Sequence, residues 1–214
     1  MVTACIFDLD GVIVDTAHYH FMAWQKLAKE LGVDLTQQEN ERLKGVGRIE
    51  SLNIILEIGG IALPDDEKER LATKKNAWFV EYIQAMKKEE IFPGAKDLFD
   101  ALHRHNIKVG LASSSKNART VLQKLEIENS FEAIVDGTMI DKSKPDPEIF
   151  LKASALLHVS PAECVVVEDA EAGVEAALRA GMKCIGIGKP QQLGKANLVF
   201  DHIGKLSYDI LKTL

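Results

Sequence analysis

This chain has few cysteines and no excess of basic residues, and each of these shortages excludes a class of protein. The 3 cysteines among 214 residues are too few and too scattered for a disulfide framework, and none forms a CxxC metal pair. We expect all three to be small buried apolar residues in a reducing compartment. Lys and Arg total 26 against 32 Asp and Glu, a net charge of −6. The chain therefore lacks the electrostatic footprint of a protein that binds nucleic acid or anionic membranes.

Long hydrophobic runs are also missing. No uninterrupted apolar stretch approaches the roughly 18 residues of a membrane span. The first charged residues are Asp8 and Asp10 rather than lysines, which does not fit a secretory signal. With 46% hydrophobic and 27% charged residues, the composition is that of an ordinary globular domain. We expect a cytoplasmic protein with no nucleic-acid or membrane partner.

The sequence does have a regular alternation of short apolar runs and helical patterns. Buried parallel strands are predicted at Ala4–Phe7, Val109–Ala112, Ala133–Val135, Cys164–Val167, Cys184–Ile187 and, more weakly, Leu198–Phe200. Helices are predicted between most of them, at Gly94–His105, Lys116–Leu125, Pro147–Leu157 and Ala170–Ala180. This alternation predicts an α/β fold with an open, doubly wound (Rossmann-like) parallel sheet.

One long segment does not alternate. From about Thr16 to Lys87 the sequence shows only helical periods, with apolar faces that include Trp24, Trp78 and Tyr82. We therefore predict a helical cap domain at residues 16–87, inserted into an α/β core domain of residues 1–15 and 88–214. The charged run Lys87–Glu90 is expected to be a solvated return linker.

Residues whose side chains can take part in catalysis or bind a metal follow four of the predicted strands. In open α/β sheets ligands bind beyond the carboxyl ends of the strands, and the residues found there are Asp8 and Asp10, then Ser113 to Asn117, then Lys144, then Glu168 and Asp169. Each alone would suit a turn or a helix N-cap. Clustered carboxylates, however, repel unless a cation lies among them, and oxygen-only ligands suit Mg²⁺. One carboxylate can attack an electrophile while a hydroxyl and a lysine hold phosphoryl oxygens. Strand periodicity would place Asp10 on the same side as Asp8.

These residues resemble the four motifs of the haloacid dehalogenase superfamily. The motifs are Asp8-Leu9-Asp10-Gly11-Val12, Ser113, Lys144-Pro145 and Glu168-Asp169, and the resemblance covers essentially the whole chain. The second aspartate argues against true dehalogenases, which lack it. Further segments resemble the β-phosphoglucomutase family: Asp15-Thr16-Ala17-x-Tyr19-His20-Phe21, Leu43-Lys44-Gly45-Val46-x-Arg48, Lys75-Asn76 and Leu111-Ala112-Ser113-x-Ser115-Lys116-Asn117.

The resemblance implies a magnesium-dependent isomerase of carbohydrate metabolism. It would interconvert β-D-glucose 1-phosphate and D-glucose 6-phosphate through an aspartyl phosphate and β-glucose 1,6-bisphosphate. The implied catalytic residues are the phosphorylated nucleophile Asp8, the general acid/base Asp10, the phosphate holders Ser113 and Lys144, and Thr16 and His20 in support of Asp10. The implied Mg²⁺ ligands are Asp8, the Asp10 carbonyl, Glu168 and Asp169. The implied substrate-binding residues are Asp10, Gly45, Val46, Arg48, Lys75, Ser115, Lys116 and Asn117.

The cap residues also admit structural readings. A mutase must grip a second phosphate, a task that suits a planar guanidinium, but Arg48 could equally be a surface arginine near the start of a helix at Glu50–Ile58. His20 shares a helix face with Trp24 and could be a buried structural histidine. We expect Trp24, Trp78 and Tyr82 to be cap core. A cap on two short linkers could close and keep water off the phosphoenzyme.

Two other functions stay open at this stage. Gly47 stands where the family has Ser, Ser114 where Ala is common, and Ala170-Glu171 where some members have Ser-Gln, so the resemblance implies the reaction type and leaves the sugar open. The main alternative is a sugar-phosphate phosphatase of the same superfamily, acting on a compound such as 2-deoxyglucose 6-phosphate. A catalytically silent regulatory protein is the third reading, and the intact charged cluster argues against it. The expected partner is a small sugar phosphate, and the expected state is a monomer.

Overall fold

The computed structural model describes residues 2–43 and 46–214. The chain divides into two compact units, one of residues 1–15 and 87–214 and one of residues 16–86. We call the first the α/β core and the second the helical cap.

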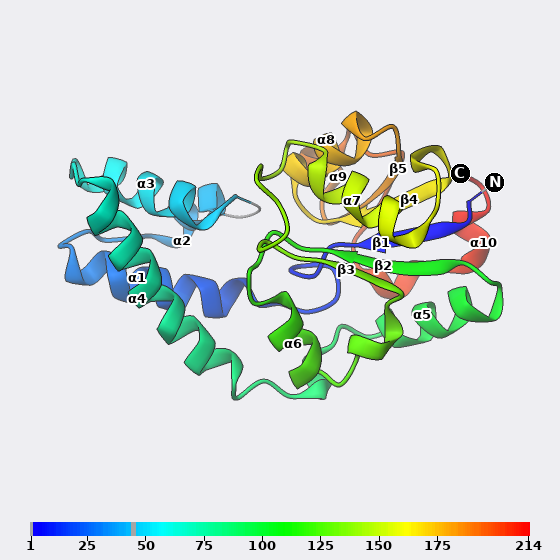
Figure 1. The fold of residues 1–214 in the computed structure, drawn as a ribbon, viewed down its shortest axis with the longest axis horizontal. Coiled ribbons are helices and arrows are strands. Elements are labelled where there is room, and N and C mark those ends of the chain that lie inside the picture. Colours follow the sequence, from blue (N-terminus) through cyan, green and yellow to red (C-terminus); the bar gives the residue numbers. More distant parts are fainter. Residues whose placement is uncertain (1, 44–45) are drawn as a thin grey trace. The chain divides into compact units, whose positions relative to one another are not determined.

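The α/β core is built on one six-stranded parallel sheet (Figure 1). Its strands are β1 (Ala4–Phe7), β2 (Lys108–Ala112), β3 (Ala133–Val135), β4 (Cys164–Glu168), β5 (Lys183–Ile187) and β6 (Leu198–Phe200). All six predicted strands are present, and β2, β4 and β5 are each one residue longer than expected. The predicted α/β fold class is therefore confirmed.

The strand order places the chemistry-bearing strands at the centre of the sheet. The order is β3-β2-β1-β4-β5-β6, so the chain builds outward from β1 in one direction and then crosses to the other side. The point where the order reverses is where doubly wound sheets bind ligands. Phe7, the last residue of β1, is in register with Leu111 on one side and Val167 on the other. The residues that follow these three positions therefore emerge at the same level.

Helices cover both faces of the sheet (Figure 1). They are α5 (Ala95–Arg104), α6 (Ala118–Lys124), α7 (Glu148–Leu157), α8 (Glu171–Arg179), α9 (Pro190–Leu193) and α10 (Tyr208–Leu211), with short 3₁₀ turns at Lys88–Glu90, Glu128–Ser130, Pro161–Glu163 and Ile203–Lys205. Alternate residues of a strand point to opposite faces. Ile6 accordingly joins the cluster packed by α7 and α8, whereas the ring of Phe7 meets Phe99 of α5 edge-on at 5.1 Å.

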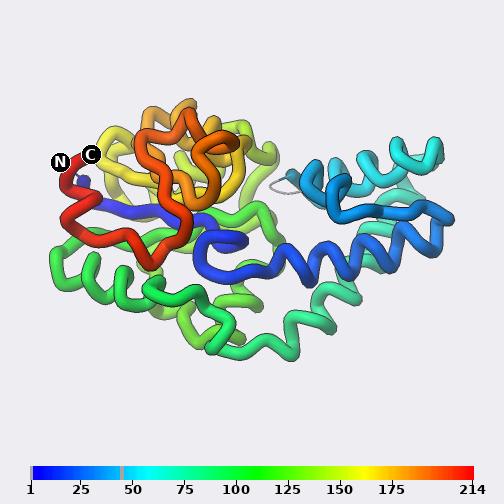
Figure 2. The backbone as a smooth tube through the Cα atoms, turned by 180° about the vertical axis from the view of Figure 1, so that it is seen from behind, coloured from blue at the N-terminus to red at the C-terminus, as the bar shows by residue number. Residues whose placement is uncertain are grey.

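The helical cap contains α1 (Ala17–Glu30), α2 (Gln37–Asn40), a 3₁₀ turn at Glu41–Leu43, α3 (Arg48–Gly59) and α4 (Asp65–Ile83). As expected, its described residues form no strand. Helices α1 and α4 lie side by side (Figures 1 and 2). A core that includes Trp24, Leu27 and Ile55 holds the helices together. Trp78 only packs against this core, and Tyr82 is half-buried and outside it, so the prediction that both belong to the cap core is wrong for Tyr82.

Among the described helices, none combines the length and apolar character that crossing a bilayer requires. The three cysteines are free thiols in the interior of the core, as their small number predicted.

Candidate active site

Lys144 is the centre of a buried ionic cluster at the carboxyl end of the sheet. Its ammonium Nζ lies 2.5 Å from Asp8 Oδ1 and 2.7 Å from Glu168 Oε1. The same nitrogen donates to the main-chain carbonyl of Ala112 at 3.3 Å. Lys144 is only 4% exposed, so these three oxygens replace the water that a lysine normally binds. The fold thus brings together the residue that follows β1, the last residues of β2 and β4, and the loop before α7.

The cluster holds more negative than positive charge. Three carboxylates, those of Asp8, Glu168 and Asp169, offer oxygens that all lie within 4.8 Å of one another. Burial raises the pKa of Asp8 to about 6, the charge of Glu168 adds to this, and Lys144 opposes it. Burial and the charges of Glu168, Asp8 and Asp10 raise the pKa of Asp169 well above its usual value. Burial by itself lowers the pKa of Lys144, but its two carboxylate partners outweigh this and raise it.

The arrangement fits a divalent cation. When all three carboxylates are ionised, they exceed the one ammonium by two negative charges, and hard oxygen ligands are those that Mg²⁺ prefers. Gly11 keeps this space open, because a Cβ there would lie 2.0 Å from Asp169 Oδ2, and its φ of +77° also favours glycine. The Asp10 carboxylate is not part of this three-residue group. This group is made of side-chain oxygens only, and the role predicted for the Asp10 main-chain carbonyl stays a prediction.

Glu168 is fixed from two sides. Its Oε2 accepts hydrogen bonds from the amides of Asp169 and Ala170, at 2.6 and 2.9 Å. Its Oε1 faces Lys144 and lies against Gly173 of α8, where a Cβ would come within 1.7 Å of that oxygen. Sequence reasoning missed Gly173, because a glycine inside a helical pattern signals close packing only in general terms.

Asp10 lies beyond the end of its strand. Strand β1 ends at Phe7, so the two-residue strand period does not extend to Asp10, and its place on the same side as Asp8 stays a prediction. The chain instead turns, with the Gly11 amide donating to the Val14 carbonyl at 2.8 Å and Asp10 forming an isolated bridge with Val14. The Asp10 amide donates to the Asp8 carboxylate and lowers its pKa.

The segment after β2 forms a tight loop of backbone amides and hydroxyls. Ser113 is buried, and its Oγ accepts from the Ser115 amide at 3.2 Å. The Ser115 Oγ accepts from the Asn117 amide, also at 3.2 Å. Helix α6 therefore begins at Ala118 rather than at Lys116 as predicted, because the hydroxyls bind amides that a helix would use. Within the described residues, the buried Oγ of Ser114 has no hydrogen-bond partner.

The cap holds a second group of predicted site residues. The buried Lys75 Nζ lies 2.8 Å from His20 Nδ1 and 4.5 Å from the ring centroid of Trp24. His20 stacks on Phe79 with ring centroids 3.9 Å apart. Burial, followed by the positive charges of Lys75 and Arg48, lowers the pKa of His20 well below its usual value. His20 is therefore a neutral ring that accepts a hydrogen bond from Lys75.

Arg48 belongs to the same part of the cap. It is the first residue of α3, it is partly buried, and its Nη2 donates to Asn76 Oδ1 at 2.8 Å. Asn76 was part of a motif in the sequence but had no predicted role. Thr16 is buried, and its carbonyl accepts from the His20 amide at 3.0 Å. Val46 is half-buried, whereas the predicted Gly45 lies outside the described residues.

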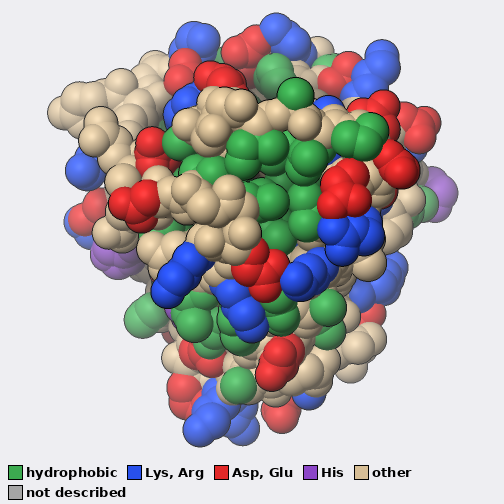
Figure 3. Space-filling view, turned by 90° about the vertical axis from the view of Figure 1, so that its left-hand side faces the viewer, with side chains coloured by type: hydrophobic (Ala, Val, Ile, Leu, Met, Phe, Trp, Pro, Cys, Tyr) green, Lys and Arg blue, Asp and Glu red, His purple; other side chains and the backbone are tan. Residues whose placement is uncertain are grey.

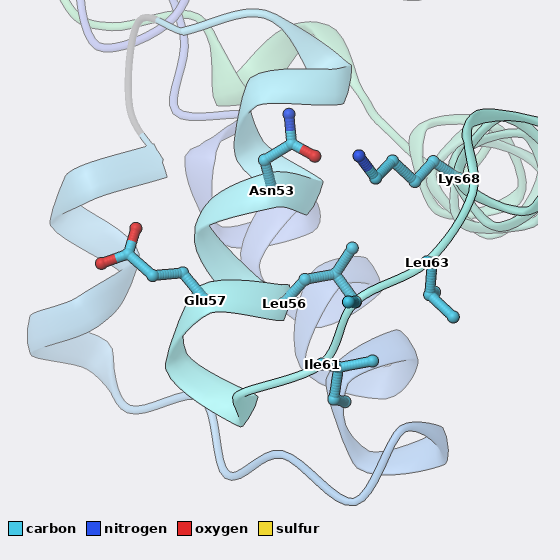
Figure 4. Close-up of a pocket in the computed structure, with 7 residues that line it drawn as sticks. Asn53, Leu56, Glu57, Ile61, Leu63 and Lys68 are labelled. Carbon is cyan, nitrogen blue, oxygen red and sulfur yellow. The ribbon is translucent and has the colours of Figure 1, made fainter.

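A pocket on the cap contains none of the predicted site residues. It is lined by Asn53, Leu56, Glu57, Ile61, Ala62, Leu63 and Lys68, between α3 and the start of α4 (Figure 4). A view onto the cap shows hydrophobic side chains gathered at the centre and charged side chains around them (Figure 3). No catalytic chemistry follows from this lining.

Comparison with known proteins identifies the family. Residues 5–187 match the family model described as haloacid dehalogenase-like hydrolase. The chain is 46% identical to a β-phosphoglucomutase of Bacillus subtilis over 210 residues, which is 97% of this chain and 93% of that protein. It is 35% identical to a phosphorylated carbohydrates phosphatase of Thermotoga maritima, over 91% of this chain and 89% of that protein.

A solved structure gives the same result. The crystal structure of a β-phosphoglucomutase from Clostridium difficile matches with a TM-score of 0.97 and 44% identity, over 100% of this chain and 96% of that chain. The buried lysine-carboxylate cluster, the fold and these matches all agree. The chain belongs to the haloacid dehalogenase-like hydrolase family.

Proposed function

We propose that the protein is a β-phosphoglucomutase, a magnesium-dependent isomerase that interconverts β-D-glucose 1-phosphate and D-glucose 6-phosphate. The observation that carries the reaction class is the buried cluster in which Lys144 joins Asp8 to Glu168. The choice of this reaction within the family is supported by the β-phosphoglucomutases from Bacillus subtilis and Clostridium difficile, which match nearly the whole chain.

In the proposed reaction Asp8 is the nucleophile. The 6-hydroxyl of β-D-glucose 1-phosphate attacks the phosphorus of phosphorylated Asp8, gives its proton to Asp10, and the bond between phosphorus and the Asp8 oxygen breaks, which forms β-glucose 1,6-bisphosphate. The bisphosphate then turns round in the site, and a carboxylate oxygen of Asp8 attacks its 1-phosphoryl group. The bond between that phosphorus and the C1 oxygen breaks, the C1 oxygen takes the proton back from Asp10, and D-glucose 6-phosphate leaves. Lys144 and the Ser113 hydroxyl hold the phosphoryl oxygens.

The proposed Mg²⁺ ligands are Asp8, the Asp10 carbonyl, Glu168 and Asp169. When bound, the ion supplies positive charge that reduces repulsion between the Asp8 carboxylate and the incoming phosphate. Lys144 supplies part of this charge from the protein itself. Its two carboxylate partners hold it protonated, which lets it donate hydrogen bonds to an anion.

The cap is proposed to hold the second phosphate and the sugar. Arg48 is suited to the phosphate because a guanidinium binds phosphate oxygens in pairs, and Asn76 orients it. Lys75 is proposed to lie near the sugar ring, while His20 and Thr16 support Asp10. Gly45, Val46, Ser115, Lys116 and Asn117 complete the proposed substrate-binding set.

A coupled assay tests the proposal. The protein is given β-glucose 1-phosphate with a trace of β-glucose 1,6-bisphosphate, and glucose 6-phosphate and free phosphate are both measured. We expect glucose 6-phosphate to form with little free phosphate. Free phosphate released at the rate of turnover would instead favour a sugar-phosphate phosphatase, a reading supported by the 35% identity to the phosphorylated carbohydrates phosphatase of Thermotoga maritima.

We further propose that the enzyme works as a monomer in the cytoplasm. The reducing compartment is supported by the three free, buried cysteines. Size-exclusion chromatography with light scattering checks the monomer, and a stable dimer at micromolar concentration would contradict it.

A further inference from the structure

The loop that carries Lys144 is held by the carboxylate of the residue that follows it. This loop runs between β3 and α7, and Glu148 is the first residue of α7. Oε2 of Glu148 accepts from the Asp141 amide at 3.1 Å and from the Lys142 amide at 2.9 Å. A side chain at the start of the helix thus reaches back across the loop and holds the residues just before Lys144.

Neighbouring contacts reinforce this arrangement. Lys152 lies one turn further along α7. Its Nζ is 2.6 Å from Glu148 Oε1 and 2.5 Å from the Met139 carbonyl oxygen. Inside the loop, the Asp146 amide donates to the Ser143 carbonyl, and the Glu148 amide donates to Asp146 Oδ1, both at 3.0 Å. The loop is therefore closed on itself by hydrogen bonds.

The charge of Glu148 suits this task. Hydrogen bonds from Lys152 and from the amides of Lys142 and Asp141 lower the pKa of Glu148 to about 2. Its carboxylate is therefore ionised under ordinary conditions, and hydrogen bonds to an ionised acceptor are stronger than those between neutral groups. A glutamate in the first turn of a helix also interacts favourably with the positive end of the helix dipole, but that interaction requires no contact with the loop.

The position of Lys144 depends on where its loop lies. A lysine side chain is long and has many rotamers, yet the ammonium of Lys144 meets Asp8, Glu168 and the Ala112 carbonyl at once. Such a three-way contact needs a backbone that starts the side chain from one fixed place. Asp141 and Lys142 come three and two positions before Lys144, so holding their amides limits the movement of its main chain.

We propose that Glu148 is a positioning residue that keeps Lys144 aligned with Asp8 and Glu168 by binding the amides of Asp141 and Lys142. The inference deepens the proposed function and rests on it in one respect, that Asp8 is the residue phosphorylated. It does not depend on which sugar is the substrate.

The first experiment measures amide hydrogen exchange by NMR in the metal-free protein. In Glu148→Gln we expect the Asp141 and Lys142 amides to exchange at least about tenfold faster than in the parent, because they lose their ionised acceptor. The matched control is Glu128→Gln. Glu128 is also a partly exposed carboxylate, and it binds Arg119 and Gln123 rather than this loop. Unchanged exchange at Asp141 and Lys142 in Glu148→Gln would overturn the proposal.

The second experiment asks whether Glu148 acts through Lys144. The rate of Asp8 phosphorylation by acetyl phosphate is measured in single turnover for the parent, Glu148→Gln, Lys144→Met and the double variant. We expect Glu148→Gln to slow the parent by about tenfold or more but to change Lys144→Met by less than about twofold, because coupled residues are not additive. Equal slowing in both backgrounds would mean a general structural role and would overturn the proposal.

A milder variant guards against a folding defect. Lys152→Met removes the ion pair and the bond to the Met139 carbonyl but leaves the two amide bonds of Glu148, so we expect exchange and phosphorylation to stay within about twofold of the parent. If Lys152→Met slows the phosphorylation of Asp8 as much as Glu148→Gln does, the effect belongs to the ion pair and the proposal is overturned. Acetyl phosphate is not a sugar phosphate, so this assay does not depend on the sugar substrate. A parent protein that is phosphorylated by acetyl phosphate but does not convert glucose phosphates would contradict the proposed function and not the role of Glu148.

Discussion

Asp8 combines the two properties of a phosphorylated residue, burial beside a cation and an unfavourable environment for its own charge. Its raised pKa, about 6, means that the folded protein disfavours the ionised carboxylate relative to water. We therefore expect Asp8→Asn to abolish phosphorylation by acetyl phosphate without lowering the melting temperature. Asparagine keeps the shape but supplies no nucleophile. Intact-protein mass and thermal melting measure both effects, and more than a few per cent residual turnover would contradict the covalent mechanism.

Arg48 is the residue that should separate a mutase from a phosphatase. A charge-assisted hydrogen bond is worth about 1.5–3 kcal/mol, and a paired grip on phosphate somewhat more. We expect Arg48→Ala to lower kcat/KM for β-glucose 1-phosphate by about a hundredfold or more. Hydrolysis of the phosphoenzyme should continue, so the ratio of free phosphate to glucose 6-phosphate should rise.

The chain offers a matched control for this prediction. Arg42 is also a cap arginine, but it is exposed and pairs with Glu57 on the surface. Arg42→Ala should leave the rate and the product ratio unchanged. If Arg48→Ala behaves like Arg42→Ala, Arg48 is only a surface residue, as one sequence interpretation allowed.

At the scale of elements, helix α8 bears directly on Glu168. Alanine is a better helix former than glycine by about 1 kcal/mol, so Gly173→Ala should stabilise α8 if nothing touched the new methyl group. That methyl group would, however, lie 1.7 Å from Glu168 Oε1 and push the carboxylate away from Lys144. We expect a lower melting temperature and at least about tenfold slower phosphorylation of Asp8. A melting temperature above that of the parent would show that Glu168 moves aside at no cost.

Helix α7 gives a prediction about pH. The folded pKa of Glu148 is about 2, below its ordinary value of 4.5, so its ionised form stabilises the folded protein at pH values above 4.5. That stabilisation is lost as the pH falls from 4.5 toward 2. The stability difference between the parent and Glu148→Gln should therefore be constant near neutral pH and shrink in acid. Chemical denaturation at several pH values measures it, and a difference independent of pH down to 3 would contradict the prediction.

At the scale of the whole molecule, the excess negative charge of the carboxylate cluster should make stability depend on Mg²⁺. A ligand that binds only the folded protein, present at a hundred times its Kd, stabilises by about 2.7 kcal/mol. We expect excess chelator to lower the melting temperature and to stop phosphorylation of Asp8. Adding Mg²⁺ back should restore the melting temperature and the phosphorylation of Asp8 in the parent, and should restore much less of both in Asp169→Ala. Full activity in excess chelator would exclude the proposed metal requirement.

Much of the fold could be predicted because hydrophobic periodicity is a local property of the chain. Six apolar runs separated by helical patterns fixed the α/β class, and the long helical stretch indicated an inserted unit. Parallel strands bring their carboxyl ends to one edge, so the gathering of Asp8, Lys144 and Glu168 could also be expected. The start of α6 was misplaced, because the hydroxyls of Ser113 and Ser115 capture amides in a way that periodicity does not reveal.

The sequence by itself determined the fold class, the edge of the sheet where the charged residues meet and the chemistry that they support. Only the tertiary structure decided which atoms touch: Lys144 with Asp8 across 136 positions of sequence, Lys75 with His20 across 55, and Glu148 with the amides of its own loop. Residue type and spacing set what a side chain is able to do. Contacts between distant residues depend on strand order, register and loop closure, and these are fixed only when the whole chain packs.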